Sequence, residues 1–455
     1  MVIKKFGGTS VKGSERIKNL IEIISGSDEK MLIVVSAIGG VTNLLVSICD
    51  NLHHHDKIFA NNDLKQISKI HSDIIKELDL GNQGTEFLNR EIQKIKNIID
   101  SISQEIQLSP NQKDSIISTG EILSSKLIHL AIEKSGRKIV LIEARDVLKT
   151  DNNFTDAEVD MWATQKQFEK IIKPIFDDNN IAIMGGFIAS NNDGKTTTIG
   201  RGGSDYTASI AANMLDAERL EIWTDVDGIM TVDPKFNPNA KKVLHLSYDE
   251  AAELAYFGAR VLHPKTIGPA IKKMIPVKVK NSFDPKQKGT LIADFENHPK
   301  VLKALSYWED ITVINIKSNR MLGAYGFLSK VFEIFNNYET PVDLIATSEV
   351  SLSLTIDNIR NLTHIIQELE KFSSVSVTFN HAIISAIGDG IKQTAGIAAR
   401  FFGVLKDINI NMVSIGASEV NLSVVLKEGD LEHALNTLHK EFFETDLDPN
   451  LFESN

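Results

Sequence analysis

The sequence predicts an α/β protein, in which a three-layer domain with a mainly parallel sheet is followed by a smaller, duplicated α/β region. Up to about residue 295, short apolar runs typical of strands alternate with segments of helical periodicity. Two of the strands run into glycine-rich loops that open a helix. Beyond residue 295 a segment recurs at a constant offset of 70 residues. The 455-residue chain is long enough for two or three domains.

The first predicted strand, 2–6, leads directly into the loop Gly7-Gly8-Thr9-Ser10. The helix that follows has apolar residues at the i, i+3, i+4, i+7 spacing, namely Ile17, Leu20, Ile21 and Ile24. Glycines let backbone N–H groups approach an anion closely, and the positive end of a helix favours negative charge. With Lys5 just before it, this loop is a candidate phosphate site.

Further strands continue the alternation, and one long polar-apolar stretch interrupts it. Residues 62–80 and 84–107 predict a helical insertion, and the Asp, Pro, Lys and Gly content of 282–299 predicts a domain boundary. The strands are predicted at 31–36, 138–142, 181–185, 219–223 and 277–280.

A second glycine loop is the most informative feature of the chain. The run Gly200–Ala208 lies between a predicted strand at 196–199 and a helix over 208–215, and it combines an anion-binding turn with a guanidinium and a carboxylate. Asp205 falls where a helix N-cap is expected. Alone, such a run is most often an ordinary turn with a capping residue. No G-x-x-x-x-G-K-[ST] motif occurs, so a phosphate site here is not a Walker loop.

Four more polar segments follow strands or open helices, which is where ligands bind in parallel sheets. Each of them alone could be a turn or a cap. They are 36–43, 118–121, 223–228 and 257–264.

Composition restricts the function classes. A formal charge of −11 argues against a general nucleic-acid or membrane-surface binder and favours a small-molecule substrate. The single cysteine, Cys49, excludes an intrachain disulfide and a multi-cysteine metal site, and we read it as a buried apolar residue. The run His53-His54-His55 is read as a solvated loop, so no protein metal site is predicted. We find no signal peptide or membrane-spanning run and expect a cytoplasmic protein.

The repeat relates residues 326–353 to residues 396–423, and each copy is predicted as a helix, a strand, a Ser-Glu turn and another strand. We predict a catalytic domain at 1–295 and a regulatory region at 296–455. The two modules are expected at approximately 310–385 and 386–455, either separate or interleaved. Structural padding or an oligomerisation surface remains the alternative reading of the repeat.

Four segments resemble, in order and spacing, the signatures of the aspartokinases. They are Lys5–Val11, Gly200–Ala208, Thr224–Gly228 and Gly258–Pro264. The repeat resembles the tandem ACT domains of that family, and Val342–Val350 is most similar to the monofunctional, lysine-sensitive type. The resemblance covers essentially the whole chain. It implies an amino-acid-kinase domain followed by two ferredoxin-like βαββαβ ACT modules.

The implied reaction converts ATP and L-aspartate to ADP and 4-phospho-L-aspartate, the first step of lysine, threonine and methionine biosynthesis. A carboxylate nucleophile is already ionised at pH 7 and needs no general base, so positioning and charge neutralisation must supply the rate. By resemblance Lys5 neutralises the transferring phosphate and Asp205 orients Lys5. Arg201 would hold the α-carboxylate and Glu121 the α-ammonium of aspartate, while Thr42 and Ser204 hydrogen-bond the substrate.

The resemblance also assigns a nucleotide site. Gly7, Gly8 and Ser10 would donate to phosphate oxygens, and Thr224 and Asp225 would face the nucleotide. Mg²⁺ is expected with ATP, held mainly by phosphates and water. Three further nucleotide positions depart from the residues common in the family: Met230, Lys235 and Arg260.

In the first ACT copy the resemblance implies an effector pocket, in which Asp343 and Glu349 could face an ammonium group. Lysine is the first candidate and threonine the second. A homodimer or a dimer of dimers through the ACT modules is expected. The alternatives are a sister amino-acid kinase acting on another carboxylate and a non-catalytic amino-acid sensor. The pocket would comprise Met321, Gly326, Phe327, Leu328, Asp343, Ser348 and Glu349.

Overall fold

The computed structural model describes residues 1–103, 105–178, 180–257, 264–295, 302–318, 325–444 and 448–453. The chain divides into two compact units. The first unit comprises Met1–Gly228 and Val261–Asp294, and the second comprises Ile229–Arg260 and Phe295–Asn455. Residues 229–260 therefore belong with the C-terminal part of the chain, although they lie within the predicted catalytic segment. The predicted functional boundary at residue 295 remains a prediction.

A mainly parallel sheet forms the middle layer of the first unit. Within this unit its strands run in the order β12-β11-β7-β1-β2-β4-β3, and only β12 is antiparallel to its neighbour. The predicted α/β class with a parallel sheet is thus confirmed. The strands are β1 (Val2–Phe6), β2 (Met31–Val35), β3 (Val140–Ile142), β4 (Ile181–Gly185), β7 (Arg219–Thr224), β11 (Val277–Asn281) and β12 (Thr290–Ile292), and β5 (Ile188–Ser190) pairs with β6 (Thr196–Thr198) in a separate hairpin.

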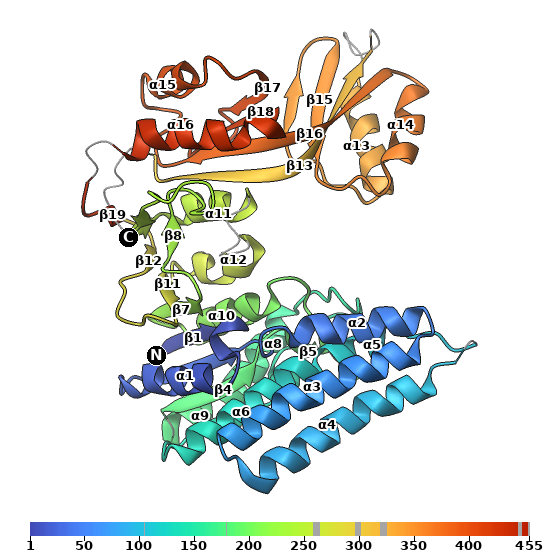
Figure 1. Cartoon of the computed structure of the whole chain (residues 1–455), viewed down its shortest axis with the longest axis vertical. Helices are drawn as coiled ribbons and strands as arrows, with labels where there is room; N and C mark the ends of the chain where they lie inside the picture. The colour runs from blue at the N-terminus through green and yellow to red at the C-terminus, as the bar shows by residue number, and fades with distance from the viewer. Residues whose placement is uncertain are drawn as a thin grey trace. The chain divides into compact units, whose positions relative to one another are not determined.

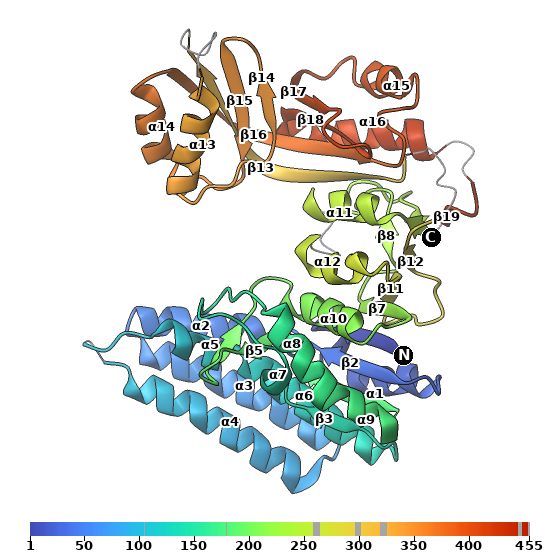
Figure 2. The same cartoon turned by 180° about the vertical axis from the view of Figure 1, so that it is seen from behind.

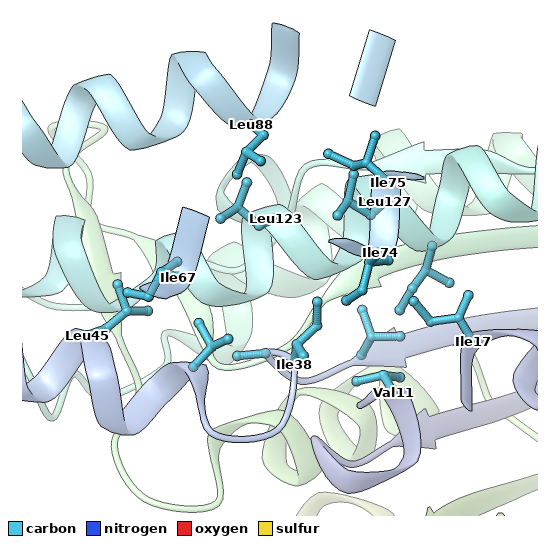
Figure 3. Packing of buried hydrophobic residues seen from close by; sticks show 14 of the residues in the cluster. Val11, Ile17, Ile38, Leu45, Ile67, Ile74, Ile75, Leu88, Leu123 and Leu127 are labelled. Atoms are coloured by element: carbon cyan, nitrogen blue, oxygen red, sulfur yellow. The ribbon is translucent and has the colours of Figure 1, made fainter. Parts of the chain in front are cut away.

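One face of this sheet carries the largest described core. Alternate residues of β1, Phe6 among them, point toward it, and β2 contributes Met31, Ile33 and Val35. Figure 3 shows part of this cluster, including Ile17, Ile38, Leu45 and Leu127. The helices that supply it include α1 (Ser14–Ser25), α2 (Val41–His53), α3 (Lys57–Glu77), α4 (Gly81–Ser101) and α6 (Thr119–Lys134).

The predicted helical insertion is confirmed as two long helices, α3 and α4, which lie side by side in Figure 1. Their helical stretches begin earlier than the predicted 62–80 and 84–107, and α4 ends at Ser101. Asp56 caps α3 by accepting a hydrogen bond from Phe59 N at 3.1 Å. The three preceding histidines are exposed at the turn between α2 and α3.

The other face of the sheet is covered by α10 (Gly203–Met214), with α12 (Pro264–Lys272) packed against it. Asn213 Nδ2 donates to Pro269 O at 2.7 Å, and Ala270 N donates to Ser209 Oγ at 2.9 Å, which joins the two helices. The remaining helices of this unit are α5 (Pro110–Ile117), α7 (Ala144–Val147), α8 (Met161–Gln167) and α9 (Lys173–Asp178).

The second unit contains a six-stranded antiparallel sheet in the order β14-β15-β13-β16-β18-β17. Each repeat copy gives the predicted helix, strand, turn and strand: α13, β14 and β15 in the first copy, and α15, β17 and β18 in the second (Figures 1 and 2). The bounds are β13 (Ala304–Lys317), α13 (Phe327–Asn337), β14 (Ile345–Thr347), β15 (Ser351–Ile356), α14 (Leu362–Glu370), β16 (Ser374–Ile387), α15 (Ile397–Val404), β17 (Ile410–Ile415), β18 (Asn421–Lys427) and α16 (Leu431–Phe443).

Two long strands, β13 and β16, are shared by both modules. The second half of β13 pairs with β15, while the first half of β13 pairs only with the second half of β16, which in turn pairs with β18. Each module is therefore four-stranded and takes half of each long strand. The first follows the predicted βαββαβ order, β13-α13-β14-β15-α14-β16, whereas the second runs β16-α15-β17-β18-α16 and takes its fourth strand from the earlier β13. The remaining elements of this unit are β8 (Ile229–Met230), β9 (Lys242–Val243), β10 (His245–Leu246), α11 (Tyr248–Tyr256) and β19 (Phe452–Glu453), with β9 pairing with β8 and β19.

Candidate active site

The candidate site lies where the parallel strands of the first unit end. Phe6 of β1 is in register with Val35 of β2 and Trp223 of β7, and Val35 is in register with Gly185 of β4. Because all these strands run in the same direction, the loops after residues 6, 35, 185 and 224 meet at one edge of the sheet. Lys5 lies in β1 and Thr42 on the helix after β2, while Glu121 lies on α6. The other predicted catalytic and substrate-binding residues follow the β5–β6 hairpin: Arg201, Ser204 and Asp205.

Lys5 and Asp205 form the central ion pair of this edge. Lys5 is the penultimate residue of β1, is 8% exposed, and points toward the face covered by α10. Asp205 stands in the first turn of α10, and its Oδ1 lies 2.7 Å from Lys5 Nζ. An ammonium group carries three N–H donors, so Lys5 can hold Asp205 and still donate to a phosphate oxygen.

The loop after β1 is braced from within the protein. Gly7 N donates to Trp223 O at 3.1 Å, and Ser10 N donates to Gly7 O at 3.0 Å. These two amides are predicted to donate to phosphate, but both already donate to backbone carbonyl groups. Gly8 N, in contrast, has no acceptor among the described residues. A Cβ at Gly8 would lie 2.9 Å from Ala37 O, so only glycine fits there. The loop after β2 approaches closely enough for Gly39 N to donate to Gly8 O at 3.0 Å.

Ser282, which the sequence analysis missed, supports this loop from β11. Its Oγ is within hydrogen-bonding distance of Ser10 Oγ at 2.8 Å and of Thr224 O at 2.9 Å, and Ser10 Oγ donates to Trp223 O at 3.2 Å. The only signal in the sequence was its position directly after the predicted strand at 277–280. Ser10 thus acts as a link between the loops after β1, β7 and β11.

Glu121 is the most perturbed acid of the site. It is 4% exposed on the first turn of α6, and its Oε1 accepts a hydrogen bond from Ala37 N at 3.0 Å. Its Oε2 is buried without a hydrogen-bond partner in the described part of the chain. Burial raises the pKa of Glu121 from 4.5 to about 8, while the positive charge of Lys5 opposes this rise. A cation placed beside Oε2 would supply the missing partner.

The three other predicted substrate residues differ in exposure. Thr42 is half-buried in the first turn of α2, and Ser204 is buried in the first turn of α10. A Cβ on Gly186 would lie 2.7 Å from Ser204 Cα, so the loop after β4 packs directly against Ser204. Arg201 is exposed at the turn between β6 and α10 and forms no ion pair within the described residues. This side chain is available to an incoming anion.

The predicted nucleotide residues divide between the two units. Thr224 and Asp225 follow β7 in the first unit, where Thr224 Oγ1 donates to Asp225 Oδ1 at 3.2 Å. Met230 and Lys235 belong to the second unit, in which Lys235 Nζ lies 3.2 Å from Glu309 Oε2 and over the ring of Tyr307. Arg260 lies outside the described residues.

The described residues of the predicted effector pocket lie on three segments of the first ACT module. Gly326 precedes α13 with φ of 80°, Phe327 is half-buried against Phe372, and Leu328 is exposed. Ser348 Oγ is hydrogen-bonded to Ser351 Oγ at 2.6 Å, and Glu349 is exposed in the same turn. Met321 lies outside the described residues.

Asp343, one of the two acids of the predicted effector pocket, has a perturbed pKa. Burial and then the charge of Asp357 raise the pKa of Asp343 from 3.8 to about 7, against a hydrogen bond from Thr355. Its Oδ2 is buried without a hydrogen-bond partner among the described residues. As at Glu121, an ammonium group would compensate the charge.

Two features are absent from the described ranges. No group of three or more His, Cys, Asp or Glu side chains in these ranges is arranged to hold a metal ion. None of the described helices is both long and apolar enough to cross a membrane.

Comparison with known proteins gives one consistent result. Residues 1–281 match the amino acid kinase family, and residues 384–442 match an ACT domain. The lysine-sensitive aspartokinase 3 of Escherichia coli strain K12 is 35% identical over 452 residues, which cover 98% of this chain and 99% of that protein.

Solved structures agree with this match. E. coli aspartokinase III in complex with aspartate and ADP, in its R-state, superposes with a TM-score of 0.87 at 35% identity, covering 97% of this chain and all of that one. The same enzyme with lysine and aspartate, in its T-state, gives a TM-score of 0.81 at 35% identity, with 97% and 99% of the two chains covered.

Proposed function

This chain belongs to the amino acid kinase family and, within it, to the aspartokinases, and from that premise we propose how its residues carry out the reaction. The enzyme transfers the γ-phosphate of ATP to the β-carboxylate of L-aspartate and opens a branch of amino-acid biosynthesis, as the resemblance implied. The matches favour this activity over a sister kinase or a non-catalytic sensor. The observation that carries the mechanism is the buried Lys5–Asp205 pair at the sheet edge.

In the chemical step a β-carboxylate oxygen attacks the γ-phosphorus, and the bond to the β–γ bridging oxygen breaks to release ADP. Both reactants are anions, so their approach is the main barrier. Lys5 compensates charge on the phosphoryl oxygens as the group is transferred, and Asp205 holds the ammonium group in place. Gly8 N, which has no acceptor among the described residues, can donate to a phosphate oxygen, while the hydrogen bonds of Gly7 and Ser10 fix the shape of the loop.

Recognition of aspartate uses the remaining groups of the same edge. The α-ammonium binds beside Glu121 Oε2, and the resulting ion pair stabilises the ionised form of this buried acid. Arg201 binds the α-carboxylate through a two-pronged contact, for which a guanidinium is suited. Thr42 and Ser204 donate hydrogen bonds to the bound substrate. The β-carboxylate is thereby left facing Lys5.

The nucleotide is bound as its Mg²⁺ complex. As expected for Mg²⁺ with ATP, the phosphates and water supply most of the ligands of the ion. Thr224 and Asp225 contact the nucleotide from the loop after β7. By resemblance we also assign Met230, Lys235 and Arg260 to nucleotide binding.

Regulation is assigned to lysine, bound in the first ACT module. The crystallised relative in complex with lysine and aspartate supports this choice over threonine. The second copy lacks the acid, because Val413 stands where the repeat offset places the equivalent of Asp343. Its Glu419 is moreover paired with Lys392 at 2.7 Å. One effector site per chain follows, in the first copy.

The edges of the ACT sheet suit self-assembly of the chain. The outermost strands β14 and β17 of the six-stranded sheet expose Ile345, Val413 and Ile415, which suits a homodimer or a dimer of dimers formed through the ACT modules. We assign the enzyme to the cytoplasm.

A substrate screen tests the assignment. The purified chain is incubated with MgATP, hydroxylamine and either aspartate, glutamate or N-acetylglutamate, and the acyl phosphate is trapped as its hydroxamate. We expect hydroxamate from aspartate and less than about one hundredth of that rate from the others. Preferential use of glutamate or N-acetylglutamate would show that the chain is a sister kinase.

A further inference from the structure

Asp114 is a fully buried carboxylate to which neither the sequence nor the family resemblance gave a role. It lies on α5 with 0% of its surface exposed. Three donors converge on it: Thr198 Oγ1 on Oδ1 at 2.8 Å, and Thr198 N and Thr155 N on Oδ2 at 3.1 and 2.9 Å. Burial raises the pKa of Asp114, and these hydrogen bonds oppose the rise. Such fully satisfied contacts rigidify their surroundings.

The donors belong to the two segments that hold the turn carrying Arg201. Thr198 is the last residue of β6, three positions before Arg201. Thr155 lies in the loop 151–160, whose Ala157 N also donates to Thr198 O at 2.9 Å. The neighbouring Asp156 lies against the turn itself, since a Cβ on Gly200 would be 2.2 Å from its Oδ1. Asp114 therefore fixes the base of the Arg201 turn from two sides.

The helix that carries Asp114 also carries Glu121. Although α5 ends at Ile117 and α6 begins at Thr119, the hydrogen bonds continue through the junction: Ser118 N donates to Asp114 O at 2.9 Å, and Ile122 N donates to Ser118 O at 3.2 Å. Residues seven apart lie on the same helix face, two turns from each other. One continuous helix thus supports the Arg201 turn through Asp114 and, two turns further along, carries Glu121 at the ammonium site.

We propose that Asp114 is a positioning residue for substrate recognition, which sets the distance between the α-carboxylate contact of Arg201 and the α-ammonium contact of Glu121. This inference rests on the proposed roles of those two residues. The spacing of the two contacts selects an α-amino acid and directs its other carboxylate toward Lys5. Asp114 itself, buried behind the turn, does not touch the substrate.

The test compares Asp114→Asn with the wild type under saturating MgATP. Asparagine keeps the shape but replaces one acceptor oxygen by a donor, so the Arg201 turn loses part of its support. We expect the KM for aspartate to rise about 10- to 100-fold, while the KM for ATP and the melting temperature change little. Thr198→Val should reproduce the effect, and Thr198→Ser, which keeps the hydroxyl donor, should restore near-normal KM.

A double-mutant cycle separates positioning from a general loss of structure. Arg201→Lys replaces the two-pronged guanidinium contact by a single ammonium group, which depends less on the position of the turn. In that background, Asp114→Asn should therefore raise the aspartate KM by less than about a further threefold. The control is Asp160→Ala, which removes the cap of α8 on the same loop (Asp160 Oδ1 to Ala163 N, 2.9 Å) and should lower stability without raising KM.

The KM values of the variants distinguish a failure of the positioning role from a failure of the proposed function. If wild-type protein phosphorylates aspartate but Asp114→Asn and Thr198→Val leave the aspartate KM unchanged, or raise the KM values for aspartate and ATP alike, the positioning role is wrong and the proposed function stands. Additive effects in the cycle contradict it as well. If the wild type does not phosphorylate aspartate at all, the proposed function has failed instead.

Discussion

At the scale of single residues, the site contains two buried charges in opposite situations. Lys5 has a carboxylate partner 2.7 Å away, so its charge is compensated within the protein. Glu121 has a backbone donor on one oxygen and none among the described residues on the other. A buried carboxylate without a cation favours its neutral form, which is why the pKa of Glu121 rises to about 8. In the proposed mechanism, the ammonium group of aspartate supplies this cation.

The pH dependence of aspartate binding follows from this difference. Ionised Glu121 is needed to pair with the substrate, so the KM for aspartate should fall as the pH rises from about 6.5 toward about 8, the pKa of Glu121. Initial rates at saturating MgATP measure this directly. In Glu121→Gln we expect a KM that is at least about tenfold higher and nearly independent of pH.

Stability provides an independent check on the same group. Its folded-state pKa is raised from 4.5 to about 8, so the stability it contributes is fully present below pH 4.5 and is lost as the pH rises through 8. The free energy of unfolding of the wild type should therefore decline relative to Glu121→Gln across this window. Parallel curves for the two proteins would show that Glu121 is ionised throughout.

At the scale of elements, local patterns predicted the parts that are defined by consecutive residues. Strands such as β1 and β2, the glycine loops and the repeat copies follow from apolar periodicity and turn residues, and the structure confirms them. The contacts of Asp114 and Ser282 could not be predicted, because their partners are about 40 to 270 residues away and their positions carry no motif. The grouping of residues 229–260 with the C-terminal unit has the same cause.

The turn between β6 and α10 allows a prediction at this scale. Gly200 has φ of 73°, and a Cβ there would also collide with Asp156 at 2.2 Å. Gly200→Ala should lower the free energy of unfolding by more than about 1 kcal/mol and raise the KM for aspartate, because both the backbone conformation and the contact are affected. Thermal unfolding and initial rates measure the two effects.

Gly194 provides the matched control for this substitution. It has φ of 74° in the turn between β5 and β6, and a Cβ added there would have no atom within 4 Å, so Gly194→Ala bears the conformational cost alone. Its KM for aspartate should stay at the wild-type value. Adding Asp156→Ala to Gly200→Ala should recover part of the lost stability. Equal losses in the two single variants would contradict a role for the Asp156 contact.

At the scale of the whole molecule, the chain combines a catalytic and a regulatory region, and each has an acid with one buried oxygen that lacks a partner among the described residues. The two acids, Glu121 and Asp343, are in different compact units, and each fits the ammonium group of an amino acid. One is assigned to the substrate and the other to the effector. Effector and substrate affinities must then be linked reciprocally, because an inhibitor acts only through a difference in its affinity for two states.

Lysine inhibition should depend on pH through Asp343. The ionised form is needed to bind the ammonium group, so the lysine concentration for half-inhibition should fall as the pH rises through about 7. Asp343→Asn should raise that concentration at least about tenfold and remove the pH dependence. Asp357→Asn is the informative control, because removing this neighbouring charge should shift the transition to lower pH. Inhibition by threonine alone would contradict the assignment of the effector.

The most direct test of the mechanism compares Lys5→Met with Lys4→Met. Lys4 is the adjacent buried lysine of β1, but it points to the other face of the sheet and pairs with Glu221 at 3.0 Å. For both folded variants, kcat for hydroxamate formation from aspartate and MgATP is measured, and aspartate binding is measured by calorimetry. We predict that Lys5→Met lowers kcat about 10²- to 10³-fold with aspartate affinity nearly unchanged, whereas Lys4→Met keeps kcat. A folded Lys5→Met variant with the kcat of the wild type would contradict the account.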